Sequence, residues 1–215
     1  MTNMPRTYYN YLETDKSRDM LSRITGKVDF VLIGGWAVNL YVDIQRSKDI
    51  NIAISPEQLE YFRKYGVHDY GISVKYSVIN DVSIDLFING ISDKELTIPI
   101  NEIFKHSVIM RGMKVVDKNM LLLLKLCGYF REDTIKLDKD IIDVVSLLFY
   151  AGLDINQIRD YIDKYKIDER RGHTGMLEYL DKSERLWEFI SNTKAEYIKF
   201  KTGVKKEINS VFNKR

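Results

Sequence analysis

Apolar positions in the first half of the chain recur with two different periods. Some segments repeat every three or four residues, as one face of a helix does, and others alternate every second residue, as a half-buried strand does. β-Branched and aromatic residues dominate the alternating segments. The pattern predicts helices over residues 8–25, 36–42 and 56–65, strands over residues 28–33, 49–54, 72–79 and 82–88, and two or three further short strands between residues 96 and 116.

The pattern changes at Asp117. The run that follows, over residues 118–130, has an apolar core too long for a surface strand and predicts a buried helix. Helical spacing then continues and predicts helices over residues 139–150, 154–165 and 176–200, with a basic tail from residue 199 that we expect to fray. The chain is therefore expected to be α+β, with an α+β domain over residues 1–116 and a helical domain over residues 117–215 packed against it.

Composition is that of a globular protein. Apolar residues make up 45% of the chain and charged residues 30%. A net charge of +2 argues against a protein that coats nucleic acid generally, although it is compatible with a local basic groove. The single Cys127 excludes an internal disulfide and fits a reducing compartment. Residues 1–16 have no signal-peptide core, and no apolar run approaches the roughly 20 residues that a membrane span needs. We therefore expect a cytoplasmic protein without membrane association.

Candidate chemistry begins at the double glycine Gly34-Gly35. Glycines at a predicted strand-to-helix turn let the backbone approach a phosphate closely. Asp49 and Asn51 follow at a spacing of two, which turns both side chains away from the apolar face of their strand, and Asp85 occupies a similar polar position on another strand. Oxygen ligands of this kind suit Mg²⁺ or Mn²⁺. We predict Asp49 and Asp85 as catalytic residues, with Asp49, Asn51 and Asp85 as metal ligands.

The three residues that directly precede Asp49 have side chains that can bind phosphate groups. Ser47 can offer a hydroxyl, and Arg46 and Lys48 can offer cations, to the oxygens of a triphosphate. The plainer alternative is that all three belong to an ordinary polar loop. Asp85 can also accept the proton of an attacking hydroxyl group.

These residues form a recognisable motif. Gly-Gly, a short helix and then Arg-Ser-Lys-Asp-Ile-Asn at residues 46–51 resembles the signature of the polymerase-β-type nucleotidyltransferase superfamily, in particular the AbiEii-type and related minimal nucleotidyltransferases. Residues 122–143 are similar to the helical segment of that family, Leu-x-x-Lys-Leu followed by Arg and then Lys-Asp-x-x-Asp. The resemblance covers about residues 28–150.

The resemblance implies a mixed β-sheet with flanking helices, followed by a C-terminal helical part. It also implies a transferase that binds ATP or another nucleoside triphosphate (NTP) with magnesium and passes a nucleotidyl group to an acceptor. By the same resemblance, Lys125, Arg131, Lys139 and Asp140 would line the nucleotide side of the cleft, their alternative being ordinary helix-surface charges. The acceptor could be RNA, a protein or a small molecule, and a toxin–antitoxin role would bring an antitoxin-like partner.

The chain departs from the motif at one position. The family has a second Asp where this chain has Asn51, whose carbonyl oxygen can bind Mg²⁺ but brings no charge. The affinity of the site for a metal ion should therefore be lower than that of a site with Asp at this position. We favour an enzyme, and keep as the alternative a catalytically impaired nucleotide-binding or interaction module. A third reading is a structural α+β domain with an incidental glycine turn.

Overall fold

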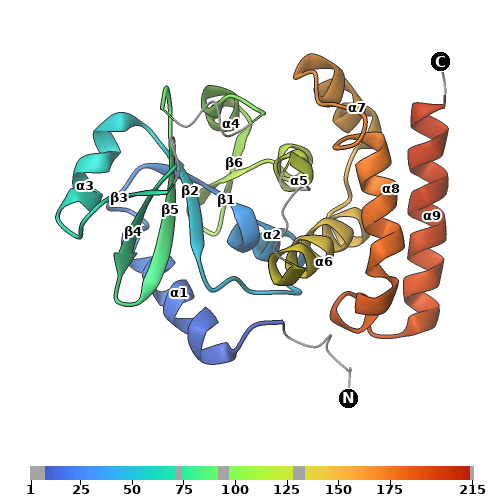
Figure 1. Ribbon diagram of the computed structural model, residues 1–215, viewed down its shortest axis with the longest axis horizontal. Coiled ribbons are helices and arrows are strands. Elements are labelled where there is room, and N and C mark those ends of the chain that lie inside the picture. Colours follow the sequence, from blue (N-terminus) through green and yellow to red (C-terminus); the bar gives the residue numbers. More distant parts are fainter. Residues whose placement is uncertain (1–7, 71–73, 92–96, 128–133, 214–215) are drawn as a thin grey trace. The chain divides into compact units, whose positions relative to one another are not determined.

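The computed structural model describes residues 8–70, 74–91, 97–127 and 134–213 (Figure 1). Contacts divide the chain into two compact units. One consists of Tyr9–Leu40 and Arg46–Asp117, and the other contains Tyr41–Gln45 together with the chain from Lys118 onward. The organisation into domains over residues 1–116 and 117–215 stays a prediction, and the assignment of Tyr41–Gln45 to the helical unit was not expected from the sequence.

A mixed β-sheet forms the centre of the first unit. Within the described ranges it has seven strands in the order β3-β4-β5-β2-β1-β7-β6. The pairs β2/β5 and β1/β7 are parallel, and the other four pairs are antiparallel. The strands are β1 (Phe30–Ile33), β2 (Ile50–Ile54), β3 (His68–Tyr70), β4 (Val74–Ile79), β5 (Val82–Ile88), β6 (Ser107–Met110) and β7 (Met113–Val116). The predicted α+β class with a mixed sheet is confirmed.

The helices of this unit lie before the first strand and between later strands. They are α1 (Tyr11–Ile24), α2 (Gly34–Val42), the 3₁₀ turn η1 (Pro56–Gln58), α3 (Leu59–Arg63) and α4 (Ile100–Lys105). The prediction of only strands between residues 96 and 116 is wrong at α4, because Ile100 and Ile103 lie three residues apart and bury the same helical face. Strand β3 was not predicted, and residues 72 and 73 of the predicted strand over 72–79 lie outside the described residues.

The pairing of β2 with β5 buries one face of both strands. Ile50, Ile52 and Ile54 align with the apolar residues of β5, and all of these side chains are fully buried. Burying an aliphatic side chain of this size contributes about 1.5–3 kcal/mol. A slip of one residue would turn every one of them toward the opposite face. The apolar face therefore fixes the register, and with it the positions of the polar residues on the other face.

The hairpin between β4 and β5 is the predicted one. Asn80 and Asp81 both have positive φ, 50° and 65°. This backbone conformation is typical of a two-residue hairpin turn whose twist matches that of the flanking strands. Asn and Asp tolerate this conformation better than other side-chain-bearing residues. The turn sets the antiparallel register in which Ile79 pairs with Val82 and Tyr76 pairs with Asp85.

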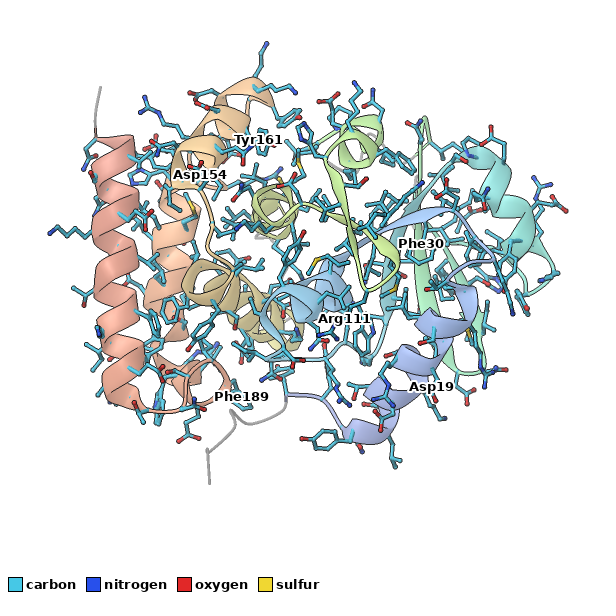
Figure 2. All side chains as sticks on the ribbon, turned by 180° about the vertical axis from the view of Figure 1, so that it is seen from behind. Asp19, Phe30, Arg111, Asp154, Tyr161 and Phe189 are labelled. Atoms are coloured by element: carbon cyan, nitrogen blue, oxygen red, sulfur yellow. The ribbon has the colours of Figure 1, made fainter. Side chains whose placement is uncertain are left out.

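The second unit is helical. Its described elements are α5 (Lys118–Cys127), α6 (Thr134–Tyr150), α7 (Ile155–Lys164), α8 (His173–Lys182), the 3₁₀ segment η3 (Ser183–Phe189) and α9 (Lys194–Phe212). Figure 2 labels Asp154 at the start of α7, where its side chain accepts hydrogen bonds from two backbone N–H groups, and Tyr161 farther along the helix. This is the predicted N-cap.

The prediction of one helix over residues 176–200 is wrong. The Ser183 hydroxyl donates to the carbonyl of Leu180, and the chain narrows to a 3₁₀ segment there. Thr193 then caps a new helix by accepting a hydrogen bond from the backbone of Glu196. The expected fraying from residue 199 is also wrong, since α9 continues to Phe212.

A search of the described helices for a membrane-spanning segment finds none with the necessary length and apolarity.

Candidate functional site

The turn between β1 and α2 is tight. Helix α2 begins at Gly34, directly after the last residue of β1, and Gly34 has φ +69°. A Cβ atom at this position would lie 2.9 Å from both Cβ and Cγ of Asn51. Glycine is therefore required twice, for its backbone conformation and for the close approach of Asn51. The first N–H groups of a helix have no partner within the helix and carry partial positive charge, so this turn is suited to an anion.

Asn51 and Asp85 lie side by side on the sheet. They are register partners in the parallel pair β2/β5, and Asn51 is also the register partner of Ile33 in β1. Neighbouring strands are about 4.8 Å apart, and register partners point to the same face. Both side chains are half-buried. The sheet thus places the Asn51 amide beside the first residue of α2, with the Asp85 carboxylate on the next strand.

Asp49 immediately precedes β2 and is half-buried. Its Oδ1 accepts a hydrogen bond of 2.6 Å from the hydroxyl of Ser47. Ser47 is only 4% exposed, so water competes little for this bond. The predicted role of Ser47 toward a triphosphate stays a prediction, and in this structure its hydroxyl holds the carboxylate of Asp49.

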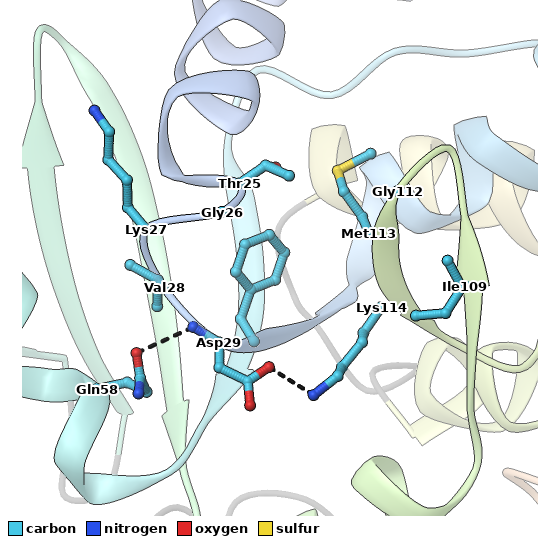
Figure 3. A pocket seen from close by; sticks show the side chains of 11 residues that line it. Thr25, Gly26, Lys27, Val28, Asp29, Gln58, Ile109, Gly112, Met113 and Lys114 are labelled. Carbon is cyan, nitrogen blue, oxygen red and sulfur yellow. Dashed lines mark hydrogen bonds and ion pairs between the residues drawn. The ribbon is translucent and has the colours of Figure 1, made fainter.

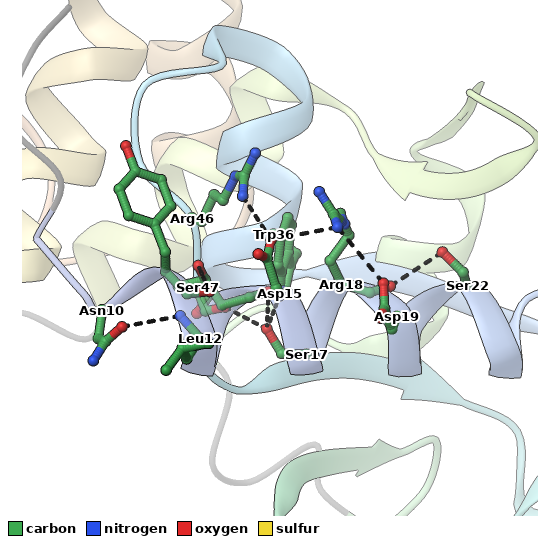
Figure 4. A network of polar contacts seen from close by, with 12 residues as sticks. Asn10, Leu12, Asp15, Ser17, Arg18, Asp19, Ser22, Trp36, Arg46 and Ser47 are labelled. Atoms are coloured by element: carbon green, nitrogen blue, oxygen red, sulfur yellow. Dashed lines mark hydrogen bonds and ion pairs between the residues drawn. The ribbon is translucent and has the colours of Figure 1, made fainter.

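Helix α1 contributes a serine that the sequence reasoning missed. Figure 4 shows Ser17 of α1 between Trp36 and Ser47: the indole Nε1 donates to Ser17 Oγ at 3.1 Å, and Ser17 Oγ donates to the backbone carbonyl of Ser47 at 2.6 Å. Ser17 and Thr14 occupy the buried face that α1 otherwise fills with apolar residues. Ser17 could have been identified from the sequence as a hydroxyl side chain on the buried face of an amphipathic helix.

The two predicted cations near Asp49 have partners on or beside α1. Arg46 forms an ion pair of 2.9 Å with Asp15, and its guanidinium lies 5.9 Å from the centre of the Tyr11 ring. The Lys48 ammonium lies 5.4 Å from the centre of the Tyr9 ring. Both ion pairing and cation–π contact at such exposed positions are weak. Binding of triphosphate oxygens by Arg46 and Lys48 stays a prediction.

Lys125 and Asp140 belong to a buried ion cluster of the helical unit. The Lys125 ammonium lies 3.0 Å from Asp140 Oδ1 and 2.8 Å from Asp143 Oδ2, and Lys139 also contacts Asp143. Burial by itself would lower the pKa of Lys125, but Asp143 and Asp140 raise it above its usual value. Burial lowers the pKa of Lys139, against the attraction of Asp143.

The carboxyl group of Asp143 lies at the centre of this cluster. Burial alone would raise its pKa, but the ammonium groups of Lys125 and Lys139 lower it below the usual value. These charges therefore stabilise one another inside the helical unit. A nucleotide-binding role for Lys125 and Asp140 stays a prediction, and Arg131 lies outside the described residues.

The donor set near the start of β2 is of the type that Mg²⁺ takes. Asp49, Asn51 and Asp85 supply hard oxygen atoms, and protein-bound Mg²⁺ commonly uses one or two carboxylates together with phosphate oxygens and water. In the ranges that the structure describes, no three Asp, Glu, His or Cys residues are grouped so that they could hold a metal by themselves. The residues thus fit a metal that arrives with a phosphate-bearing ligand better than a resident ion.

Two hollows lie elsewhere in the chain. One, of about 490 Å³, opens beside Asp29, Gln58 and Lys114 (Figure 3), where Asp29 pairs with Lys114 at 2.7 Å and its backbone N–H donates to Gln58. Asp29 precedes β1, whereas Gly34 follows the end of that strand, so this hollow lies at the opposite end of β1 from the glycine turn. The other, of about 580 Å³, lies in the helical unit, where His173 stacks on Phe212.

The close approach at Gly34 can be tested by mutation. Gly34→Ala should lower the free energy of unfolding by about 1–3 kcal/mol more than Gly112→Ala, because a Cβ at Gly34 meets Asn51 while a Cβ at Gly112 meets nothing within 4 Å. Both glycines have positive φ, 69° and 79°, so the backbone strain is matched. Urea denaturation followed by circular dichroism measures the difference. Equal losses in the two variants would contradict the proposed clash.

Because the ion cluster is buried, we expect the free energy of unfolding to depend on Asp143 and on pH. Asp143→Ala should cost about 3–5 kcal/mol at pH 7, because it leaves the buried Lys139 without the carboxylate that it contacts. Asp181→Ala, which removes an exposed carboxylate, should cost less than about 1 kcal/mol.

The direction of the pH effect follows from the lowered pKa of Asp143. Its carboxyl binds a proton more readily in the unfolded state, so its contribution is present above about pH 4 and is lost as the pH falls toward the folded-state pKa. Unfolding curves from pH 7 to pH 2.5 should therefore lose less stability in Asp143→Ala than in the wild type. An unchanged acid dependence would contradict this assignment.

No protein-family model matches the chain, and no curated protein matches its sequence. Similar solved structures include a presumed nucleotidyltransferase from Helicobacter pylori, with 11% identity, coverage of 93% of this chain and 96% of that chain, and a TM-score of 0.49. Another is JHP933 from Helicobacter pylori, with 13% identity, 94% and 95% coverage, and a TM-score of 0.45.

A third similar structure is the STING-associated CdnE c-di-GMP synthase from Capnocytophaga granulosa, with 9% identity, coverage of 95% of this chain and 82% of that chain, and a TM-score of 0.29. Identities and TM-scores this low say nothing of substrate or mechanism. The chain is similar, over more than nine-tenths of its length, to structures that include a presumed nucleotidyltransferase and a c-di-GMP synthase.

Proposed function

We propose that the protein is a nucleotidyltransferase that binds an NTP with Mg²⁺ or Mn²⁺ and transfers a nucleotidyl group to an acceptor. One observation carries the proposal: Asn51 packs on Gly34 at the start of α2 and is the register partner of Asp85, so an anion-binding turn and metal-type oxygen donors adjoin. Asp49, two residues ahead of Asn51, adds a second carboxylate.

Each residue has a distinct task in this proposal. The backbone at Gly34 and Gly35 accommodates phosphate oxygens at the helix N-terminus. Asp49, Asn51 and Asp85 would hold the metal ion, which supplies charge neutralisation for the phosphates. Lys48, whose side chain is exposed, is available to a triphosphate if it leaves the Tyr9 ring. Asp85 also accepts the proton of the acceptor hydroxyl group, whose oxygen attacks the α-phosphorus of the NTP while the bond to the bridging oxygen breaks and pyrophosphate leaves.

The second candidate function is a nucleotide-binding module without transferase activity. The observation that favours it is the identity of residue 51, where an amide replaces a carboxylate at the position between β1 and β5. A neutral ligand leaves two carboxylates to balance the metal charge and weakens metal binding. This candidate shares the nucleotide site and differs only in the chemical step.

Transfer of label distinguishes the two candidates. Incubation with α-³²P-labelled ATP, CTP, GTP or UTP, Mg²⁺ or Mn²⁺, and total RNA or lysate should label an acceptor, and Asp49→Ala or Asp85→Ala should reduce labelling by at least about 100-fold. Asp29→Ala, at the opposite end of β1, is the matched control and should retain activity. Metal-dependent NTP binding without transfer would instead support the binding module. The absence of both NTP binding and label transfer would reject both candidates.

Position 51 provides a gain-of-function test. Asn51→Asp is nearly isosteric and adds a negative charge beside Asp85, so it should tighten Mn²⁺ binding in the presence of NTP by about 10-fold and increase transfer. Without metal, the same charge should lower thermal stability, because like charges then lie on adjacent strands. Calorimetric titration with Mn²⁺ and a thermal melt with and without metal measure both effects. A variant that binds metal no better than wild type would argue against a metal site at residue 51.

The acceptor class, an antitoxin-like partner and a cytoplasmic location stay predictions.

A further inference from the structure

We propose that Ser17 of α1 is a positioning residue for Asp49, acting through Ser47. The inference rests on the proposed function, because it concerns the carboxylate that would hold the metal. It adds α1, a helix outside the nucleotide-binding motif, to the parts of the chain on which that carboxylate depends. Ser17 does not touch Asp49 directly, and its effect passes through two hydrogen bonds.

The path consists of three polar contacts, of which the two made by Ser17 are buried and the one to Asp49 is partly buried. Trp36 Nε1 donates to Ser17 Oγ at 3.1 Å, Ser17 Oγ donates to the Ser47 carbonyl at 2.6 Å, and Ser47 Oγ donates to Asp49 Oδ1 at 2.6 Å. Ser17 is 0% exposed and Trp36 and Ser47 are each 4% exposed. Because no water replaces these bonds easily, the path holds its geometry only while each member is present.

Ser17 has one hydroxyl hydrogen and two acceptors within reach. The carbonyl of Thr14, in its own helix, lies at 3.1 Å, and the carbonyl of Ser47 lies at 2.6 Å. The shorter contact takes the better-defined bond. Because the indole of Trp36 donates to the same oxygen, the hydroxyl cannot turn freely, and its hydrogen is directed away from the indole. Trp36 thus orients Ser17, and Ser17 anchors the backbone of Ser47.

Anchoring this backbone decides where the Ser47 hydroxyl points. Residue 47 is held at its carbonyl by Ser17, while its side chain holds Asp49 two residues later. A second contact from α1, the Asp15–Arg46 ion pair, fastens the preceding residue. Without Ser17, the carbonyl of Ser47 loses its buried donor, and the loop must shift or admit water. Either change moves Asp49 relative to Asn51 and Asp85.

The test compares Ser17→Ala with Ser22→Ala in the intact chain. Ser22 is an exposed α1 residue whose hydroxyl donates to the Arg18 carbonyl within its own helix. Mn²⁺ affinity is measured by electron paramagnetic resonance at saturating ATP, together with the thermal midpoint of each variant. Ser17→Ala should weaken Mn²⁺ binding by about 10-fold, as loss of a group that orients a metal ligand does, while Ser22→Ala should leave it unchanged.

Two further variants keep the test informative if Ser17→Ala folds poorly. Ser17→Cys retains a weak donor and acceptor of similar shape and should bind Mn²⁺ with intermediate affinity. Trp36→Phe removes the indole donor and part of the buried ring volume but keeps the Ser17 hydroxyl, so it should reduce Mn²⁺ affinity less than Ser17→Ala does. Excess Mn²⁺ should restore nucleotide binding in folded Ser17 variants, which a general loss of structure would not allow.

The outcomes separate the two proposals. If wild-type protein shows no Mn²⁺-dependent ATP binding, the proposed function fails, and the inference about Ser17 fails with it. If wild-type protein binds Mn²⁺ and ATP but the folded Ser17 variants bind them equally well, only the positioning role is overturned. A graded loss from Trp36→Phe through Ser17→Cys to Ser17→Ala, with Ser22→Ala unchanged, supports it.

Discussion

The parallel pairing of β2 with β5 in a single register underlies the rest of the candidate site. Apolar side chains of both strands fill one face, and this burial sets which residues oppose one another. Asn51 and Asp85 are then neighbours without any contact of their own being needed to bring them together. The packing of the core, more than the attraction of polar groups, assembles the candidate chemistry.

A second constraint acts at the end of β1. Gly34 leaves β1 and enters α2 with no intervening loop, and the space that a side chain would take is filled by Asn51. The amide therefore lies against the helix N-terminus, where a phosphate would also be attracted. An amide in this place supplies an oxygen donor without charge, so the candidate site would offer a metal ion fewer negative charges than two Asp residues at positions 49 and 51 would provide.

Several polar side chains in this protein form hydrogen bonds or ion pairs with one another. The hydroxyl of Ser47 holds Asp49, the indole of Trp36 holds Ser17, and Lys125 is enclosed by Asp140 and Asp143. In a buried setting each such contact fixes geometry, because the alternative is an unsatisfied group. Residues that a motif suggests as ligand contacts can thus serve first to orient the groups that meet the ligand.

The sequence by itself determined the local elements near the site: the strand that ends at Gly34, the alternation that turns Asp49 and Asn51 away from the apolar face, and the hairpin at Asn80 and Asp81. These follow from periodicity and turn chemistry, which act over a few residues. It did not reveal helix α4 or the break before α9, because short apolar spacings fit more than one element.

Only the tertiary structure decided the strand order, the pairing of Asn51 with Asp85, and the hydrogen-bond path through Ser17. A serine within a helix has no distinctive pattern of its own, and its importance depends on what is packed against it. The same holds for Lys125, for which the sequence left open a nucleotide contact or a helix-surface charge, and whose ammonium lies between the carboxylates of Asp140 and Asp143. Partners distant in the sequence are brought together by the burial of apolar faces, and no local pattern encodes which polar groups will then meet.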